Sequence, residues 1–234
     1  MIQLRSNVIT LLGDTHSYQG TYYALNYKLS KQSCDVVFLG DGGEGFSSER
    51  TDFNSLANIN ELCRERGIYL YYLRGNHTNP NVWRRGYEFS HLLLVDDYTE
   101  ARFPNQKTAL LVGGGVSIDR FSRTRGRDYW TDEITPYKKM EKQFDFLIAH
   151  DCPDYFNHST ASLVTSPYAA FLRMDKTLLK DALAQRTTMD KIVADIQPKK
   201  CFSGHFHNNL KEMVNNIEYR CVDINELYEF NSNE

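Results

Sequence analysis

The sequence predicts a layered α/β protein in which helices cover both faces of β-sheet. Short aliphatic and β-branched runs alternate with longer amphipathic ones through residues 7–77, in the order strand, helix, strand, helix, strand. Each apolar run has four to six nearly continuous residues, which is typical of strands that are buried on both faces. In the second amphipathic run, Leu56, Ile59, Leu62 and Cys63 recur at helical spacing.

The first half of the chain supplies most of this alternation. We expect strands within residues 7–14, 35–41 and 68–77, and helices within residues 21–30 and 51–66. A further short helix is expected around residues 82–85, directly after Asn79-Pro80.

The second half leans toward strands. We expect them at residues 92–95, 108–115, 144–150 and from residue 200, followed by one or two closing hairpins. Residues 176–197 predict two helices, because a leucine stripe marks the first, and Thr187 with Asp190 resembles a capping box that begins the second. Pro198 would end that second helix. Only the last residues, YEFNSNE, are expected to be disordered.

Length and charge exclude several classes of protein. The chain has 234 residues, 41% of them hydrophobic and 24% charged, so we expect a single domain, residues 1–234, with one sizeable core. The formal net charge is -3. No global positive field therefore exists to attract a polyanion, and non-specific coating of nucleic acid is disfavoured.

Compartment signals are few. No run approaches the roughly 18–20 apolar residues that cross a bilayer, and the opening MIQLRSNVITLLGD lacks the pattern of a secretory leader. We therefore expect neither export by that route nor a membrane span. The five cysteines are odd in number and widely spaced, with no CxxC pair, which indicates reduced thiols in a cytoplasm.

Polar residues that can bind metal follow several of the predicted strands. Ligands of α/β proteins bind beyond the carboxyl ends of strands, so we expect these residues to converge on one crevice. Five of the seven histidines lie at such strand ends, whereas His91 and His158 do not and are expected to be structural. The residues at the strand ends are Asp14, His16, Asp41, Asn76, His77, His150, His205 and His207.

Seven of these side chains combine oxygen and imidazole donors: Asp14, His16, Asp41, Asn76, His150, His205 and His207. Seven donors exceed the four of a tetrahedral zinc site. They suit two divalent ions that lie about 3.5–4 Å apart and share a carboxylate, an arrangement that clamps both oxygens of an in-line displacement at phosphorus. We expect manganese, with iron, zinc, cobalt or nickel as alternatives.

The ordered motifs GDTHS, GDGGE, GNH, a lone histidine after an apolar strand, and GHFH resemble those of the calcineurin-like metallophosphoesterase superfamily. The resemblance extends from Asp14 to His207. It implies a layered α-β-β-α sandwich and metal-dependent hydrolysis of phosphate mono- or diesters. The stretch GGGVSIDRFSRTRGRDYWTDE is similar in layout to a loop of bacterial and phage members.

The resemblance also implies roles for individual residues. A hydroxide activated by the metals would attack phosphorus in line, while His77 assists the leaving oxygen. Glu44 occupies the place where the protein-phosphatase branch has an aspartate that orients this histidine, and the alternative is a surface carboxylate. Asn76 is a candidate substrate contact as well as a ligand. The implied ligands are Asp14, His16 and His207 for the first metal, Asp41 as the bridge, and Asn76, His150 and His205 for the second.

This chain departs from the phosphatase pattern at the residue that binds the phosphate. That branch has an arginine after the acid of its second motif, where this chain has Gly45. The replacement is expected from the arginines at 120, 123, 125 and 127, with Arg123 first and Arg120 second, because guanidinium forks match phosphate geometry. Trp130 could stack on a base or cover a leaving group. The alternatives are a solvated loop for the arginines and a packing role for Trp130.

The sequence leaves three alternative functions open. The preferred one is a phosphomonoesterase or phosphodiesterase that acts on a small molecule, a phosphoprotein or a nucleotide. The second is a metal-dependent nuclease of the same fold, which the arginine loop permits and the net charge does not encourage. The third is a non-catalytic scaffold, which the complete set of seven ligands disfavours.

Overall fold

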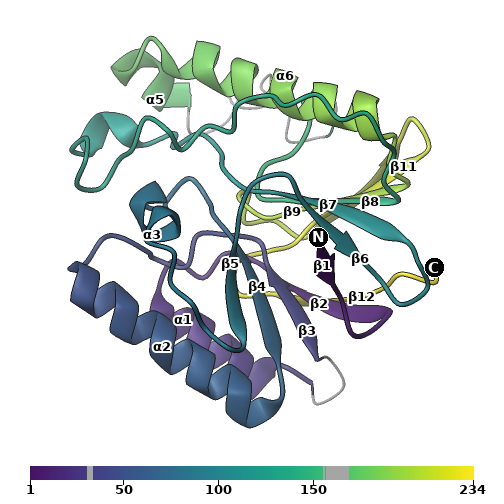
Figure 1. The fold of residues 1–234 in the computed structure, drawn as a ribbon. Helices are drawn as coiled ribbons and strands as arrows, with labels where there is room; N and C mark the ends of the chain where they lie inside the picture. Colours follow the sequence, from purple (N-terminus) through teal and green to yellow (C-terminus); the bar gives the residue numbers. More distant parts are fainter. Residues whose placement is uncertain (31–33, 155, 157–168) are drawn as a thin grey trace.

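The computed structural model describes residues 1–30, 34–154, 156 and 169–234, and in these ranges two β-sheets lie between helices (Figure 1). The first sheet has the order β12 (Leu227–Asn231), β2 (Val8–Leu12), β3 (Asp35–Phe38), β4 (Tyr69–Leu73), β5 (Leu92–Val95). The second has the order β1 (Ile2–Gln3), β6 (Thr99–Arg102), β7 (Thr108–Val112), β8 (Phe146–Ala149), β9 (Lys200–Ser203), β11 (Ile217–Cys221), β10 (Leu210–Val214).

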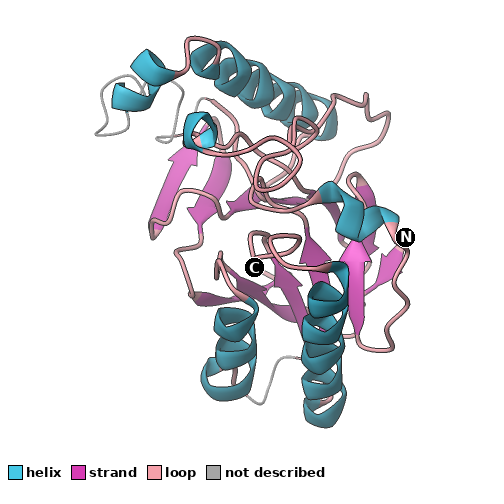
Figure 2. Ribbon diagram, turned by 90° about the vertical axis from the view of Figure 1, so that its left-hand side faces the viewer, coloured by secondary structure: helices cyan, strands magenta, loops and turns pink. Residues whose placement is uncertain are grey.

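The longer helices cover the outer faces of the two sheets, and several shorter helical segments accompany them. Together these elements are α1 (Tyr18–Tyr23), its π-helical continuation η1 (Ala24–Lys28), α2 (Glu49–Arg66), α3 (Pro80–Arg84), the 3-10 turn η2 (Arg120–Ser122), α5 (Ala169–Met174) and α6 (Leu178–Ile196). Figure 2 shows the strands in the middle of the molecule and the longer helices on its two outer sides. The predicted α-β-β-α layering is therefore confirmed.

Alternating side chains along each strand fill three separate layers of core. Leu11 of β2 points between the two sheets with Phe146 of β8, whereas the next residue, Leu12, packs toward α2 with Leu56. Successive strand residues face opposite sides of a sheet, so a continuous apolar run is what a strand buried on both faces requires. The third layer joins the other face of β7 and β8 to α6, for example through Ile192.

Parallel pairing brings the ligand-bearing loops to one edge. β2, β3 and β4 are parallel neighbours, with Leu12 opposite Phe38 and Phe38 opposite Tyr72. In the other sheet β8 and β9 are also parallel, with Ile148 opposite Phe202. The loops after these five strands therefore leave the sandwich at the carboxyl ends of their strands, which is where sites lie in open α/β sheets.

The prediction of two helices in residues 176–197 is wrong, because α6 is one continuous helix. Asp190 does not cap a second helix. Its carboxylate accepts a hydrogen bond from the backbone N–H of Asp154, at 2.9 Å. Met189 is buried against the sheet, and the hydroxyl of Thr188 donates to the carbonyl of Ala184. The helix ends at Ile196, and Gln197 adopts the left-handed backbone conformation that terminates helices.

The expected disorder of the last residues is also wrong. Residues Leu227–Asn231 form β12, which pairs antiparallel with β2 and buries Phe230 between the sheets. The short strands β1 and β6 were not predicted either, because β1 has only two residues and β6 has the mostly polar sequence TEAR. Among the described residues, no helix combines the length and the apolar character that a membrane crossing requires.

Candidate metal centre

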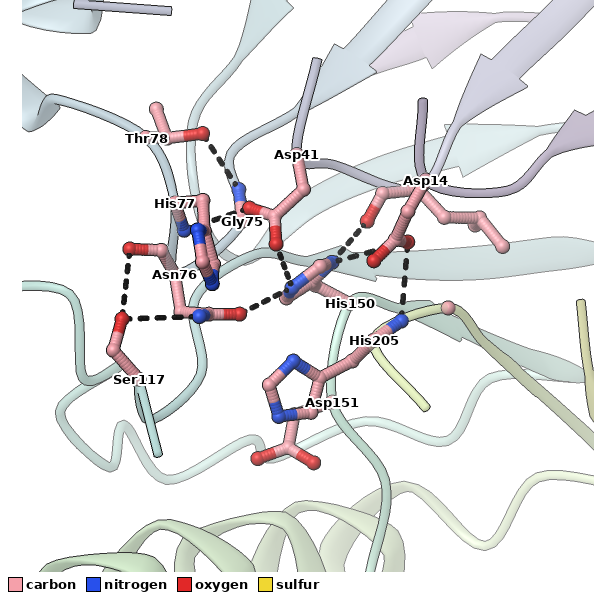
Figure 3. Close-up of polar contacts among 12 residues, drawn as sticks. Asp14, Asp41, Gly75, Asn76, His77, Thr78, Ser117, His150, Asp151 and His205 are labelled. Carbon is pink, nitrogen blue, oxygen red and sulfur yellow. Dashed lines mark hydrogen bonds and ion pairs between the residues drawn. The ribbon is translucent and has the colours of Figure 1, made fainter. Parts of the chain in front are cut away.

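Side chains from five loops converge at the carboxyl edge of the two sheets. Figure 3 shows Asp14, Asp41, Asn76, His150 and His205 directed toward a common centre. They come from the loops after β2, β3, β4, β8 and β9. The convergence predicted from the strand ends is therefore present in the structure.

The first donor cluster consists of Asp14, His16 and His207. Nε2 of His207 lies 3.2 Å from Oδ2 of Asp14 and 2.8 Å from Nε2 of His16. The hydrogen bond that the His207 ring donates to the carboxylate of Asp14 raises the pKa of His207, although partial burial opposes this. Two imidazole nitrogens and a carboxylate oxygen that face one another suit a shared cation.

The second donor cluster consists of Asp41, His150 and His205, with Asn76 beside it. Nε2 of His150 lies 2.9 Å from Oδ1 of Asn76 and 3.4 Å from Oδ2 of Asp41. The other ring nitrogen of His150 lies 2.7 Å from the carbonyl oxygen of Leu39. A hydrogen bond of this kind fixes the orientation of a metal-binding imidazole and leaves Nε2 free for the ligand.

Charge and burial act against each other in this second cluster. Burial disfavours a charged His150, but the carboxylates of Asp41 and Asp14 outweigh it and raise the pKa to about 9. Burial would raise the pKa of Asp41, yet the nearby His150 holds it well below its usual range. Burial lowers the pKa of His205 far below its usual value, and the charge of His150 lowers it further. Metal ions bind these side chains in their deprotonated forms, so a metal ion at this cluster would displace any proton from it.

The two clusters fit a pair of metal ions. In each, the donor atoms lie within 4.8 Å of one another, and the mixture of carboxylate and imidazole suits first-row transition metals. Four of the residues have left-handed backbone, namely His16 (φ 51°), Asp41 (φ 57°), His205 (φ 67°) and His207 (φ 47°). Such conformations cost about 1–3 kcal/mol each and concentrate at functional sites.

Asp41 also organises the loops around it. Its Oδ1 accepts a hydrogen bond from the backbone N–H of His77 at 2.8 Å, and its carbonyl accepts one from the N–H of His16 at 2.7 Å. A Cβ at Gly75 would lie 1.9 Å from Oδ1 of Asp41. Only glycine therefore allows the Asn76-His77 loop to approach this carboxylate.

His77 lies next to a guanidinium at the edge of the centre. Its ring contacts that of His16, with centroids 5.2 Å apart. Nη2 of Arg123 is 2.6 Å from Nδ1 of His77 and 2.7 Å from Oδ2 of Asp119. Burial lowers the pKa of His77, Asp41 opposes that effect, and Arg123 adds to it.

Comparison with known proteins identifies the family of this chain. The family model described as calcineurin-like phosphoesterase matches residues 8–209. The chain belongs to the calcineurin-like phosphoesterase family. Members of this family are metal-dependent phosphoric ester hydrolases that generally use a pair of divalent ions. A search of curated protein sequences gave no match.

Solved structures resemble this phosphoesterase at low sequence identity. One crystal structure has a TM-score of 0.51 and 11% identity, and the alignment covers 93% of this chain and 91% of the other. A structure described as a 5'-nucleotidase from Staphylococcus aureus, in complex with alpha-ketoglutarate, has a TM-score of 0.47 and 10% identity over 95% of this chain and 50% of its own. A cold-active protein-tyrosine phosphatase from a psychrophilic Shewanella has a TM-score of 0.36 and 13% identity over 94% and 72%. At 11% identity, the likeness to the first of these structures concerns the fold alone.

Glu44 of this phosphoesterase is buried behind the centre. Its Oε2 accepts a hydrogen bond from the hydroxyl of Thr78 at 3.0 Å, and that hydroxyl accepts one from the N–H of Gly75 at 3.1 Å. Burial raises the pKa of Glu44 to about 8. The alternative of a surface carboxylate is wrong, since Glu44 is 0% exposed. Through Thr78 the carboxylate of Glu44 is tied to the backbone of the Asn76-His77 loop, and not to the ring of His77.

The glycine at position 45 is a steric requirement. Gly45 has a φ of 83°, and a Cβ there would lie 1.9 Å from Cβ of Asn79. An arginine therefore could not occupy this place without moving the loop that carries His77.

The arginine loop divides into different environments. Arg120 is buried and forms ion pairs with Asp175 at 2.6 Å and Asp181 at 2.8 Å, so it lies apart from the donor clusters. Arg123 is the member that reaches His77, whereas Arg125 and Arg127 are exposed. The packing role of Trp130 matches its burial, at 6% exposed. Its ring packs edge-on against Phe46, 43% of which is exposed.

Two histidines, His91 and His158, are predicted to be structural. His91 stacks on Tyr69, with ring centroids 4.5 Å apart, away from the donor clusters. His158 lies outside the described residues.

Arg186 of α6 joins two of the ligand loops, and no sequence motif identifies it. Its Nε lies 3.1 Å from Oδ1 of Asp151, the residue after His150. Its guanidinium carbon lies 4.5 Å from the ring centroid of Phe206, the residue between His205 and His207. An arginine inside a helix gives no local signal of such a contact. Its position on the buried face of the helix could have been noticed.

Proposed function

We propose that this phosphoesterase hydrolyses phosphate mono- or diesters at a two-metal centre held by the seven predicted ligands. The observation that supports this most is the presence of two adjoining donor clusters, one around Asp14 and one around Asp41. They adjoin because the backbone N–H of His205, in the second cluster, donates to Oδ1 of Asp14, in the first, at 3.1 Å. We expect Asp41 to bridge the ions and manganese to serve as the metal.

Each group in the centre has a proposed task. The ions would supply Lewis acidity and lower the pKa of bound water at neutral pH. His77, at the edge of the centre, would give a proton or a hydrogen bond to the leaving oxygen of the ester. Arg123 would hold a phosphate oxygen, because its guanidinium lies beside His77 and a guanidinium matches phosphate geometry. Glu44 would hold the Asn76-His77 loop through Thr78.

Metal analysis and a pair of chromogenic substrates test this function. The protein purified in manganese should carry close to two ions per chain and should hydrolyse a nitrophenyl phosphate monoester or the corresponding diester. A chain that stays empty in excess manganese would contradict the proposal. Digestion of single-stranded DNA or RNA at a higher rate than either small ester would instead support the nuclease.

We also propose a reducing compartment, the cytoplasm, for this protein. All five cysteines are free, and four of them are buried. Disulfides form in oxidising compartments, so free thiols fit the cytoplasm. Labelling of the native protein with a thiol reagent, before and after unfolding, would test whether they are reduced.

A further inference from the structure

Ser117 links the side chain of Asn76 to a buried glutamate that the proposed function does not use. Nδ2 of Asn76 donates to Oγ of Ser117 at 3.0 Å. Oγ of Ser117 in turn donates to Oε2 of Glu133 at 2.7 Å, and the backbone N–H of Ser117 donates to Oε1 at 2.8 Å. Ser117 and Glu133 are both 0% exposed. Figure 3 shows Ser117 on the side of Asn76 away from His150.

The chemistry of these groups sets the direction of the chain of hydrogen bonds. In its ionised form the carboxylate of Glu133 only accepts, so it accepts a hydrogen bond from the hydroxyl of Ser117. The lone pairs of that hydroxyl are then left for the amide N–H of Asn76. An asparagine amide has one donor end and one acceptor end. Since its donor end is committed to Ser117, its Oδ1 must face the opposite way, toward His150, where it lies 2.9 Å from Nε2.

Glu133 is itself held in place by the strand end that carries Asn76. Its carbonyl accepts hydrogen bonds from Nη1 of Arg74 at 2.8 Å and from the N–H of Gly115 at 3.2 Å. Arg74 also contacts Asp97 at 2.7 Å and is 8% exposed. Arg74, the residue after β4, therefore holds Glu133 at the end of that strand, and the contact with Gly115 joins the two ends of the segment from Gly115 to Glu133.

We propose that Ser117 and Glu133 are positioning residues that keep Oδ1 of Asn76 directed at the second metal ion. This inference rests on the two-metal centre of the proposed function. It goes beyond that function because neither residue is a ligand or a substrate contact. Partners behind metal ligands orient them, and their loss commonly weakens metal affinity or activity by about 10–100-fold.

Titration with manganese alone tests the role of Ser117. In Ser117→Ala, the amide of Asn76 loses its acceptor and can rotate. We expect one of the two manganese-binding events to weaken by about 10–100-fold, while the other stays within about twofold. Electron paramagnetic resonance should show fewer coupled manganese pairs and more isolated ions at equal loading. Two ions bound with wild-type affinity and an unchanged spectrum would overturn the proposal.

Glu133→Gln provides a second, independent variant. The N–H and the hydroxyl of Ser117 use different oxygens of Glu133, and glutamine replaces one of these oxygens by an NH2 donor, so one of the two contacts loses its acceptor. We expect the same selective loss at one ion. In the double variant Ser117→Ala/Glu133→Gln, the loss should match that of Ser117→Ala alone, because Glu133 acts through the hydroxyl. Fully additive losses would show that the two residues act separately and would overturn the relay.

Ser232 offers a matched control. It is also 0% exposed and accepts a hydrogen bond from an asparagine amide, Nδ2 of Asn105, at 3.0 Å. It follows β12 at the opposite end of β2 from Asp14. Ser232→Ala should leave both binding events and the spectrum unchanged. If it weakened manganese binding as much as Ser117→Ala does, the effect would be one on general stability and the proposal would fail.

The same titration separates the two proposals. A wild-type chain that binds no manganese would remove the two-metal function and this inference with it. A wild-type chain that binds two ions and turns over phosphate esters, together with a Ser117→Ala variant that behaves identically, would remove only the inference.

Discussion

The Nη2 atom of Arg123 lies 2.6 Å from Nδ1 and 3.1 Å from Nε2 of His77, so the guanidinium sits against the edge of the imidazole. Arg123 is kept there by the carboxylate of Asp119 at 2.7 Å and by the carbonyl of Asp128 at 3.1 Å. A cation and a candidate proton donor thus share one side of the metal centre. We therefore expect substitution of Arg123 to affect hydrolysis more than substitution of the other arginines in the loop.

Arg123→Ala should weaken hydrolysis of phosphate esters. A charged hydrogen bond to a phosphate oxygen contributes about 1.5–3 kcal/mol, so kcat/KM should fall by roughly 10- to 150-fold. Steady-state kinetics on the preferred chromogenic ester would measure this. Arg127→Ala is the matched control, because Arg127 belongs to the same loop and its side chain is 74% exposed. Equal losses in both variants would indicate a general effect of loop charge.

His77→Ala should keep its metal and lose turnover. The ring of His77 is not one of the proposed ligands, whereas loss of acid-base catalysis costs about 100- to 10,000-fold in rate. Metal content and kcat measured on the same preparation would check the expectation. A variant that lost one ion would instead place His77 among the ligands.

Arg120→Ala should reduce stability much more than it reduces catalysis. Removing this buried cation leaves Asp175 and Asp181 unpaired beside each other. Breaking a buried ion pair costs about 3–5 kcal/mol, and we expect roughly 2–4 kcal/mol here because Asp181 is partly exposed. Urea unfolding would measure this loss. A variant with wild-type stability and a raised KM would show that Arg120 binds substrate after all.

Glu44→Gln should change the pH dependence of stability in the metal-free protein. Burial raises the pKa of Glu44 from 4.5 to about 8. The folded protein therefore keeps a proton that the unfolded chain releases, and stability falls as the pH rises from about 4.5 through about 8. The glutamine variant lacks this loss. Between pH 5 and pH 8.5 it should gain on the order of 2–4 kcal/mol relative to wild type.

Chemical unfolding at several pH values, with a chelator present, would measure this difference. Glu49→Gln is a suitable control, because the side chain of Glu49 is 66% exposed. Parallel stability curves for wild type and Glu44→Gln would mean that Glu44 is ionised in the folded protein at neutral pH.

The layers and the ligand loops could be predicted from the sequence because their signals are local. The apolar runs before Asp14, Asp41 and Asn76 are buried on both faces, and a glycine marks the end of each. Once parallel pairing is assumed, the loops must meet. Short or polar elements such as β6 carry no comparable signal, since their register depends on the partner strand.

The surroundings of the ligands could not be predicted in the same way. Ser117 and Glu133 are separated from Asn76 by 41 and 57 positions, and Arg186 is one polar residue within a helix. Their roles depend on contacts that only the folded chain creates. The helix break expected near Thr187 failed for the same reason, because Asp190 finds its partner in the backbone of Asp154 instead of in its own helix.

The shared contact of Arg186 with both Asp151 and Phe206 has an evolutionary consequence. One guanidinium serves two loops that are more than fifty residues apart in the sequence. A substitution of Asp151 or Phe206 alone would leave the buried guanidinium of Arg186 without its carboxylate or its aromatic ring. Related proteins that replace Arg186 should therefore replace Asp151 and Phe206 as well. We expect the three positions to vary together among homologous sequences.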